Sequence, residues 1–287
     1  MSKVSVIITT KDSGKFIEAC IRAIQKSTYT DIEIIVVDNF STDNTLQIAQ
    51  SFKGVRTICA GPERSAQRNI GVHISTGDFI MVLDVDMMIQ KDLIQECVDR
   101  CRPLTEEEHT RAVNNFADFG EKRQLPVDSL YIPEIIIGEG YWIKVRNFER
   151  SFYNGTRIDA IRFSKKDKWP MYDEELTGAE DWLHDRCYSG HKAITVHGLY
   201  HNEGNFNMKK YLDKKGYYCQ WLDKYREKMN ELGEFKLPEL SIWYRYFWVF
   251  MEGGKWKKVI RHPLLFLSVL YLKMRIGVRY LCRKRSS

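Results

Sequence analysis

Two carboxylates separated by one residue end an apolar run, in Val82-Leu83-Asp84-Val85-Asp86. Ligands of open α/β sheets collect where the strands end, so an acidic pair at this point can serve a substrate. Alternation along a strand sends the two side chains to opposite faces, but at the strand exit both can bend toward one ion. Such oxygen ligands suit Mg²⁺ or Mn²⁺ held together with substrate phosphates. The simpler interpretation is that Asp84 and Asp86 begin a turn and cap the next helix.

A second carboxylate, Asp38, ends the apolar run Ile34-Ile35-Val36-Val37 and precedes the polar turn residues 39–45. We expect it on the same sheet edge as Asp84. A carboxylate there can accept the N–H of a uracil or guanine base. An ordinary turn from a strand into a helix explains the same residues, so both interpretations stay open.

The elements that must position these side chains follow from hydrophobic periodicity. The first hundred residues alternate short β-branched runs with helical patterns, which indicates βαβ units and a largely parallel sheet. Strands are expected at residues 4–8, 32–37, 55–58 and 79–83. Helices between them are marked by Ile17, Cys20, Ile21 and Ile24, then by Leu46, Ile48, Ala49 and Phe52, with N-cap residues at Ser41-Thr42-Asp43.

The pattern is less regular after Asp86, and we divide the chain into residues 1–205 and 206–287. One more helix is expected at residues 93–101, polar loops at 103–128, strands at 130–137, 158–163 and 193–196, and a helix opening near Glu180. From about Phe206 the chain is expected to be helical, aromatic and basic. The first region would hold the nucleotide and the acceptor, and the second would be a helical extension.

Composition is that of a globular enzyme. The 287 residues are 44% hydrophobic and 29% charged, with a net charge of +6, which argues against disorder, collagen or a disulfide scaffold. Seven cysteines without Cys-x-x-Cys pairs indicate neither a zinc site nor disulfides, and favour a reducing compartment. The N-terminus enters an apolar run without a charged leader, so we expect a cytoplasmic protein.

Five ordered blocks resemble the family 2 glycosyltransferases. They are Ser5-Val6-Ile7-Ile8-Thr9-Thr10-Lys11-Asp12, Val36-Val37-Asp38-Asn39-x-Ser41-Thr42-Asp43, Ser65-Ala66-Gln67-Arg68-Asn69-Ile70-Gly71, Asp84-x-Asp86 and Gly178-Ala179-Glu180-Asp181-Trp182. The resemblance covers roughly residues 4–205. It implies a GT-A fold, a Rossmann-like and mostly parallel sheet flanked by helices, and an inverting transfer of a sugar from a UDP- or GDP-type donor.

The resemblance also implies roles for residues on the donor side. By position, Thr10 and Asp38 look like contacts to the base and ribose, and Arg68 looks like a donor contact. Asp84 resembles a ribose and metal ligand, and Asp86 resembles a metal ligand for Mg²⁺ or Mn²⁺. The usual Pro-Thr-Tyr-Asn is replaced by Thr9-Thr10-Lys11-Asp12, a departure that concerns the base contacts in that loop.

On the acceptor side, Asp181 resembles the general base, and Glu180 could share or exchange that role. Taken alone, the pair is an acidic helix start that the helix dipole favours. His201 stands where the family often has a histidine that contacts the metal or the diphosphate. The competing interpretation packs His201 beside Tyr200, with His197 as the alternative ligand.

The chemistry of such a transfer requires the same set of groups. A diphosphate leaving group develops negative charge, which a divalent cation and a positioned arginine stabilise. The acceptor hydroxyl needs a carboxylate to remove its proton, a contribution of roughly 10²- to 10⁴-fold. Trp182-Leu183-His184 lacks the aromatic acceptor motif of the processive synthases, so one transfer per binding event is expected.

The C-terminal region combines aromatic residues with a basic excess. Ten Lys or Arg and no acid follow Glu252, and the apolar run at residues 264–272 has nine residues where about 20 would be needed to cross a bilayer. We therefore expect residues 206–287 to make peripheral contact with the inner face of the membrane, next to a glycan or lipid-linked acceptor. The alternatives are that these helices pack on the catalytic region or form an oligomer contact.

Two other functions compete with glycosyl transfer. A sugar nucleotidyltransferase usually has a glycine-rich phosphate loop after its first strand, but residues 9–14 contain one glycine. A catalytically silent carbohydrate- or membrane-binding module could keep the same fold. No nucleic-acid-binding motif accompanies the basic residues, so a nucleic-acid partner is not expected. The oligomeric state is left open.

Overall fold

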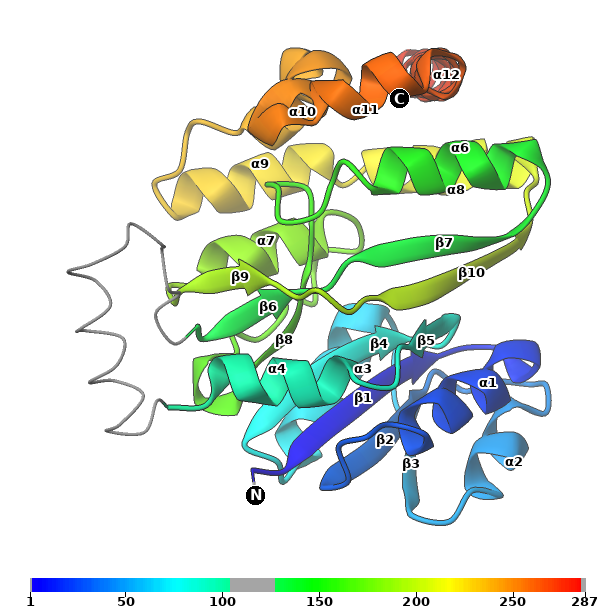
Figure 1. Ribbon diagram of the computed structural model, residues 1–287, viewed down its shortest axis with the longest axis vertical. Helices are drawn as coiled ribbons and strands as arrows, with labels where there is room; N and C mark the ends of the chain where they lie inside the picture. The colour runs from blue at the N-terminus through cyan, green and yellow to red at the C-terminus, as the bar shows by residue number, and fades with distance from the viewer. Residues whose placement is uncertain (1, 104–126, 285–287) are drawn as a thin grey trace.

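Two sheets form the centre of the protein in a computed structural model that describes residues 2–103 and 127–284 (Figure 1). The seven-stranded sheet has the order β3 (Val55–Cys59), β2 (Ile32–Asp38), β1 (Val4–Thr10), β4 (Phe79–Asp84), β8 (Ile161–Lys165), β6 (Ser129–Tyr131) and β9 (Lys192–Ile194). The three-stranded sheet has the order β5 (Met87–Ile89), β10 (Leu199–Asn205) and β7 (Glu134–Glu139). The first four strands across the large sheet pair in parallel, as the sequence predicts.

Helices cover both faces of the parallel strands, which explains why these strands read as continuous apolar runs. The helices of this part are α1 (Gly14–Gln25), α2 (Thr45–Gln50), α3 (Arg64–Ile74) and α4 (Leu93–Cys101). Val6 and Ile8 pack in the hydrophobic cluster under α1 and α4, whereas Ile7 packs in the cluster under α3. The predicted face of α1 is the buried one, with Ile17, Cys20, Ile21 and Ile24 in the core.

Strand register brings the candidate residues to one sheet edge. Thr10 pairs with Asp38 across β1 and β2, and Thr9 pairs with Asp84 across β1 and β4. The three strands therefore end side by side. The carboxyl edge of the parallel strands is where the sequence predicts the site to be.

The middle of the chain departs from the prediction. The strand expected at residues 130–137 is broken at Pro133 into β6 and β7, which belong to different sheets, because proline has no N–H for a ladder bond. β8 begins three residues later than expected, at Ile161. The sequence did not predict β5, β10 or α6 (Tyr141–Arg150). Of the predicted polar loops at 103–128, residues 104–126 lie outside the described part of the chain.

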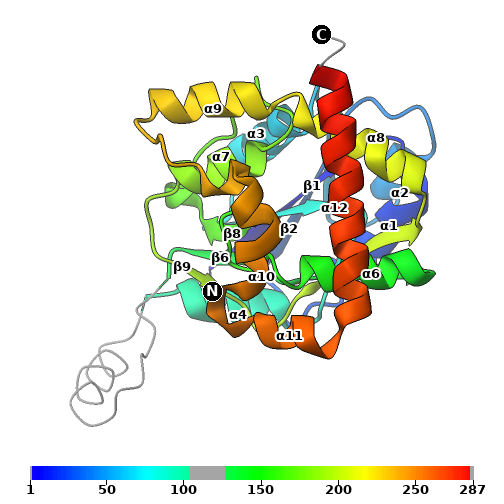
Figure 2. The ribbon, with the colours of Figure 1, turned by 90° about the horizontal axis from the view of Figure 1, so that it is seen from above.

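Of the C-terminal helices, α8 and α9 lie level with α6, and the later helices form a further layer over them, seen edge-on in Figure 1 and from above in Figure 2. The C-terminal helices include α8 (Met208–Cys219), α9 (Leu222–Glu231), η3 (Tyr244–Trp248), α10 (Val249–Met251), α11 (Trp256–Arg261) and α12 (Pro263–Lys284). Val269 and Leu272 of α12 are buried in one hydrophobic cluster with Val145 and Phe148 of α6. An apolar core thus joins the two predicted regions, whose boundary near residue 205 stays a prediction.

None of the described helices is long and apolar enough to cross a bilayer. α12 spans 22 residues, but five of them are Lys or Arg. The helix also contributes to a buried core on one side, as its residues Val269 and Leu272 show.

Candidate active site

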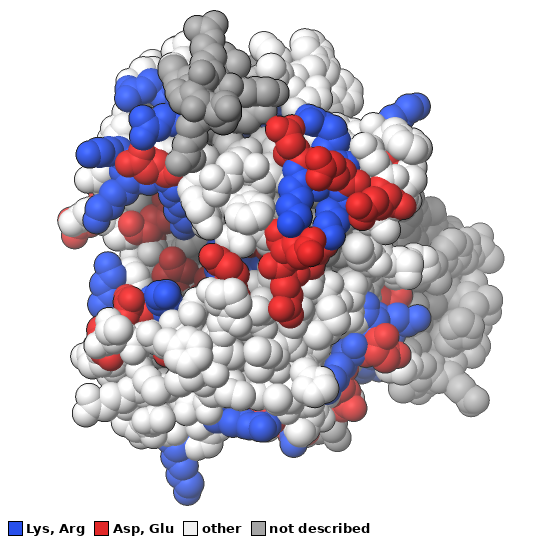
Figure 3. Space-filling model, turned by 180° about the vertical axis from the view of Figure 1, so that it is seen from behind, with Lys and Arg blue, Asp and Glu red and all other residues white. Residues whose placement is uncertain are grey.

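A cavity of about 950 Å³ lies where β1 and β4 end and extends beneath the C-terminal helices. Its walls include Thr10, Asp84, Asp86, Asp181 and His201, which come from separate parts of the sequence. Both acidic and basic side chains line this cavity. On the face shown in Figure 3, acidic and basic side chains likewise lie in mixed groups and do not form a patch of one sign. With Glu180, which also lines the cavity, six of the predicted site residues share it.

Arg68 of α3, the predicted donor contact, lies behind the cavity wall and is not among the residues that line the cavity. Its guanidinium donates to Asp181 Oδ1 at 2.8 Å and to Asp84 Oδ1 at 3.2 Å, and it packs on the Tyr172 ring with its centre 4.8 Å from the ring centroid. The side chain is fully buried. One cation thus links the end of β4 to the start of α7 (Glu180–Cys187).

Electrostatics keep both carboxylates ionised. Burial alone would raise the pKa of Asp84, but Arg68, Arg162 and Arg64 outweigh burial and hold that pKa well below its usual range. Burial likewise opposes ionisation of Asp181, and Arg68 and Arg162 again lower its pKa. The pKa of Arg68 is raised in turn, because the neighbouring anions outweigh the cost of burying its charge. The site is a set of buried ion pairs that lose their balance if one member is removed.

Glu180 occupies a different environment from Asp181. Its side chain is 4% exposed against 29% for Asp181, and its carboxylate accepts from Arg64 at 3.0 Å. Burial and the charge of Asp181 raise the pKa of Glu180. Ala179, directly before the pair, has a left-handed φ of 64°, which turns the chain into α7. Asp181 is therefore the more accessible of the two predicted bases, and Glu180 is packed behind it.

A series of charged side chains that contact one another, including Arg162 and His201, joins the two sheets. Arg162 donates to Glu134 at 2.7 and 2.9 Å and lies 3.9 Å from Asp84. Glu134 also contacts His201 Nδ1 at 3.3 Å, and His201 Nε2 is 3.3 Å from Asp86 Oδ2. This series of contacts therefore runs from Asp84 through Arg162, Glu134 and His201 to Asp86.

His201 reaches this position through strand pairing. β10 runs antiparallel to β5, with His201 opposite Met87, so its imidazole lies beside Asp86. Burial lowers the pKa of His201, but hydrogen bonds to Asp86 and Glu134 outweigh burial and raise the pKa to about 9. His197, the alternative ligand, contacts Glu96 at 2.8 Å and is not among the residues that line the cavity.

The predicted metal ligands divide into two groups. Asp86 and His201 are adjacent, and Asp86 Oδ1 is buried without a hydrogen-bond partner among the described residues. Asp84 instead turns toward Arg68. Within residues 2–103 and 127–284, no cluster of three or more acidic, His or Cys side chains is arranged to hold a metal ion.

Of the two residues predicted to contact the nucleotide base and ribose, one lines the cavity and the other does not. Thr10 lines the cavity, and its buried hydroxyl has no hydrogen-bond partner among the described residues. The Asp38 carboxylate accepts from the backbone N–H of Ser41 at 2.7 Å and from its hydroxyl at 2.5 Å, so it holds the turn after β2. Asp38 is 1% exposed and is not among the cavity-lining residues, whereas its neighbour Asn39 is.

Four cavity residues were not predicted individually. Glu134 and Arg162 were missed, although a lone charge inside an apolar strand is unusual and signals a partner. Arg64 and Gln67 lie on α3 within or beside the matched block at Ser65–Gly71. The Gln67 amide donates to the carbonyls of Thr10 and Val37 at 3.0 and 2.7 Å and so ties the ends of β1 and β2 together.

Comparisons with known proteins agree with this geometry. Residues 5–125 match the family model described as glycosyl transferase family 2. The N-terminal part of the chain is therefore similar to glycosyl transferase family 2. Glycosyltransferase GlyG of Streptococcus pneumoniae is 27% identical over 124 residues, which are 41% of this chain and 40% of GlyG. Poly(ribitol-phosphate) beta-N-acetylglucosaminyltransferase TarS of Staphylococcus aureus is 31% identical over 106 residues, 33% of this chain and 18% of TarS.

Solved structures extend the likeness over the whole chain. The structure of Staphylococcus aureus TarS 1–349 in complex with UDP-GlcNAc has a TM-score of 0.52 and 16% identity, with 97% of this chain and 89% of that chain covered. Mannosyltransferase PcManGT from Pyrobaculum calidifontis, in complex with GDP-Man and Mn²⁺, has a TM-score of 0.56 and 13% identity, with 98% and 87% covered. The predicted GT-A type fold is confirmed.

We predict that His184 makes the protein less stable as the pH falls. Its ring stacks on Tyr172 at 4.2 Å, and burial lowers its pKa to about 3. The unfolded imidazole has a pKa of about 6.5, so the unfolded state binds more protons between these values and stability falls with pH. Between pH 6 and 4, the wild type should lose about 1.4 kcal/mol per pH unit relative to His184→Phe in urea unfolding. Parallel stability curves for the two proteins would contradict this assignment.

Proposed function

We propose that the chain is an inverting, metal-dependent glycosyltransferase that moves a sugar from a UDP- or GDP-type donor to an acceptor hydroxyl or phosphate. The observation that carries the proposal is the Arg68 bridge between Asp84 and Asp181 at the wall of the cavity. It places a strand-end carboxylate and a helix-start carboxylate on one cavity, next to a guanidinium. The matched segments span only 40% of GlyG and 18% of TarS, so activity and substrates are proposed from this site.

The donor set fits a divalent cation that shares its coordination with phosphate. Asp86 has a buried oxygen without a partner, and the His201 imidazole lies 3.3 Å from its other oxygen. Oxygen and imidazole donors suit Mn²⁺, and Mg²⁺ or Mn²⁺ commonly keeps one or two protein carboxylates together with substrate phosphates. Asp86 would hold the ion together with His201 once the imidazole gives up the proton on Nε2, and Asp84 would lie beside them. When bound, such an ion neutralises charge on a departing diphosphate.

The protein's own side chains supply the remaining requirements. Arg68 is held by Asp84 and Asp181 without freedom to reorient, so its charge is pre-arranged just behind the carboxylates that face the donor. Asp181, ionised and 29% exposed toward the cavity, can accept the proton of an acceptor hydroxyl as that oxygen attacks the anomeric carbon. Attack from the side opposite the leaving diphosphate inverts that carbon in one displacement. Glu180 and Arg64 act by positioning Asp181.

The side chains of the site fit two other functions less well. A sugar nucleotidyltransferase needs a phosphate-binding loop after β1, but here that loop begins Lys11-Asp12 and its backbone is tied to the Ser41 hydroxyl. A silent binding module would not need ionised carboxylates buried around a cavity, since each costs desolvation free energy. We no longer assign Asp38 a contact with the base. Its carboxylate orders the turn that carries Asn39 to the cavity.

We also propose that the C-terminal helices contact the cytosolic face of a membrane. Along α12, Leu264, Leu267, Tyr271, Met274 and Val278 are 39 to 74% exposed. Their spacing of three and four residues places them on one side of the helix, away from the buried side that packs on α6.

Aromatic and basic side chains border this exposed stripe. Trp243, Trp248 and Trp256 are 45 to 65% exposed on the neighbouring helices. Lys257 and Arg261 are exposed on α11, and Arg275 is exposed on α12. Tryptophan favours the boundary between water and lipid, and cations favour anionic headgroups. A lipid-linked acceptor would then be presented next to the cavity beneath α12.

Asp181→Asn should abolish transfer and leave donor binding intact. The amide keeps the shape of the side chain but cannot take the acceptor proton, so turnover should fall by roughly 10²- to 10⁴-fold. Turnover is measured with the nucleotide sugar that binds, and donor affinity by calorimetry with Mn²⁺. Asp173→Asn is the matched control, because Asp173 pairs with Lys228 and does not line the cavity. Near-normal turnover of Asp181→Asn would assign the base to another residue.

Leu267→Ser together with Met274→Ser should weaken binding to vesicles that contain anionic lipid. Each substitution removes one exposed apolar side chain from the proposed contact, which should weaken binding roughly tenfold per residue. Val196→Ser serves as control, because Val196 is 79% exposed far from α12 in the sequence. Co-sedimentation measures bound protein. Unchanged co-sedimentation with a shift from dimer to monomer would show that the stripe binds a second copy of the chain.

A further inference from the structure

Cations outnumber acids in the part of the cavity under the C-terminal helices, which we name the upper lobe. The upper lobe is lined by α6, α8, η3 and α12. These four elements contribute six cations and one carboxylate to the lining, namely Arg146, Arg150, Lys214, Lys215, Arg245 and Lys273 against Glu149. Such an excess is unusual inside a protein, where charges are normally paired.

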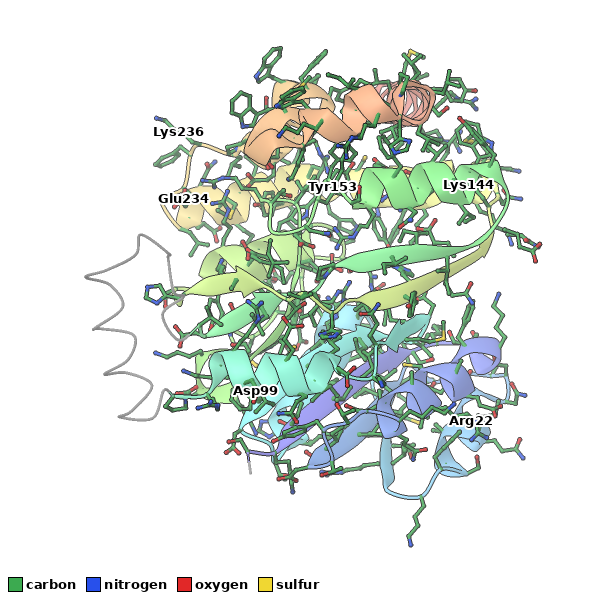
Figure 4. The ribbon with its side chains drawn as sticks, viewed as in Figure 1. Arg22, Asp99, Lys144, Tyr153, Glu234 and Lys236 are labelled. Carbon is green, nitrogen blue, oxygen red and sulfur yellow. The ribbon has the colours of Figure 1, made fainter. Side chains whose placement is uncertain are left out.

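The nearby carboxylates are already engaged. Glu149 contacts Arg146 at 2.5 Å and Lys273 at 3.5 Å, and it accepts from the Tyr153 hydroxyl. Tyr153 lies in the interior below the C-terminal helices, as Figure 4 shows. Glu203 forms an ion pair with Arg146 at 2.9 Å. Arg150 is likewise paired outside the upper lobe, with Glu134 and Asp159.

Three cations of the upper lobe, Lys214, Lys215 and Arg245, form no ion pair with a carboxylate in the described part of the chain. Lys215 has its ammonium 5.7 Å from the Tyr211 ring centroid and makes no ion pair with a described residue. Arg245 packs over the Trp182 ring at 4.8 Å and, within residues 2–103 and 127–284, makes no ion pair either. The Tyr211 hydroxyl is buried there without a hydrogen-bond partner among the described residues. These groups are donors without a matching acceptor.

Lys215 and Arg245 belong to elements that contact the segment around the proposed base. Tyr211, Lys215 and Tyr218 occupy one face of α8, since they are four and three residues apart. The Tyr218 hydroxyl accepts from Arg64 at 3.2 Å, and Arg64 binds Glu180. Arg245 lies over Trp182, the residue after Asp181, and belongs to a π-helical turn, a feature frequent at functional sites.

Burial makes this crowding of cations unfavourable. Burial and the neighbouring Arg146 lower the pKa of Lys215 to about 7, even though Glu149 and Glu203 oppose the shift. The pKa of Lys273 falls to about 8, again chiefly through burial. A bound anion would restore the balance of charge.

We propose that the upper lobe binds a phosphate group of the acceptor through Lys215, Arg245 and the Tyr211 hydroxyl. The proposal rests on the proposed glycosyltransferase function and names its acceptor class, a phosphate-bearing polyol or glycan. Phosphate accepts hydrogen bonds in several directions, which suits donors that come from α8 and η3. Tyr218, Trp182 and Asp181 line the same cavity as these donors, so a hydroxyl-bearing part of the acceptor would reach Asp181.

Calorimetry with glycerol 1-phosphate tests the subsite directly. The donor site is first saturated with Mn²⁺ and whichever of UDP or GDP binds, so that phosphate cannot enter it. The wild type should bind glycerol 1-phosphate, and Lys215→Ala and Arg245→Ala should each weaken this binding about tenfold. Lys209→Ala is the matched control, because Lys209 is exposed on the same helix and does not line the cavity. Lys215→Arg should restore most of the affinity.

Several outcomes would overturn the phosphate subsite. These are equal affinity in Lys215→Ala, Arg245→Ala and the wild type, no binding of glycerol 1-phosphate, or equally tight binding of glycerol or acetate. A Lys215→Gln variant repeats the test if the alanine variant has a lowered melting temperature. Dodecyl phosphate in detergent separates two sources of the phosphate: tighter binding than glycerol 1-phosphate supports a lipid-linked acceptor, and equal binding supports a soluble one.

The nucleotide titration keeps this result apart from the proposed function. Absence of binding by both UDP and GDP, with Mn²⁺ present, would contradict glycosyl transfer whatever the phosphate result. Nucleotide binding that is equal in wild type and Lys215→Ala, with weakened glycerol 1-phosphate binding only in the variant, supports both. Nucleotide binding with unaltered phosphate binding in the variants would remove the subsite and leave the proposed function standing.

Discussion

The buried Arg68 guanidinium, held between Asp84 and Asp181, is the interaction on which the site depends. It joins the last residue of β4 to the first turn of α7, segments that lie about a third of the chain apart. A charge removed from water is stable only with well-placed partners, and removal of one partner leaves the others uncompensated. The same bridge therefore holds the start of α7 against the end of β4 and keeps both carboxylates ionised. Arg68 thus both links β4 to α7 and balances the charge of the two carboxylates.

The parallel half of the fold could be predicted from sequence because its signals are local. Each strand from β1 to β4 is an apolar run, and the helical spacing of Ile17, Cys20, Ile21 and Ile24 marks the buried face of α1. Parallel pairing then brings Asp84 and Asp38 to one edge without any knowledge of side-chain contacts. The convergence of Asp181 on that edge came only from resemblance to the family, since it lies on a distant helix.

The rest depends on tertiary pairing that no local pattern encodes. β6 and β7 read as one strand until Pro133 separates them into two sheets, and β10 is a polar strand whose register alone brings His201 beside Asp86. Glu134 and Arg162 become site residues only through that arrangement. Asp38 shows the opposite case: its place on the sheet edge is as expected, but its carboxylate is used by the Ser41 turn. Position in a fold constrains a residue's role without deciding it.

The C-terminal helices serve two purposes in this account. One side of α12 closes a hydrophobic core with α6, while the other presents an exposed apolar stripe. Between α12 and α8 lies the upper lobe, where cations without carboxylate partners meet aromatic rings. The predicted boundary near residue 205 therefore crosses the cavity, and both parts of the chain are needed to build its walls.

The most direct test of the central claim is thermal unfolding of the wild type and Arg68→Lys with UDP- and GDP-sugars, with and without Mn²⁺. A ligand that binds only the folded state raises the melting temperature. One nucleotide sugar should stabilise the wild type in a Mn²⁺-dependent manner. Arg68→Lys should fold but lose this response, because an ammonium group cannot bridge two carboxylates as a guanidinium does. Equal stabilisation of both proteins, or none of the wild type by any donor, would contradict the central claim.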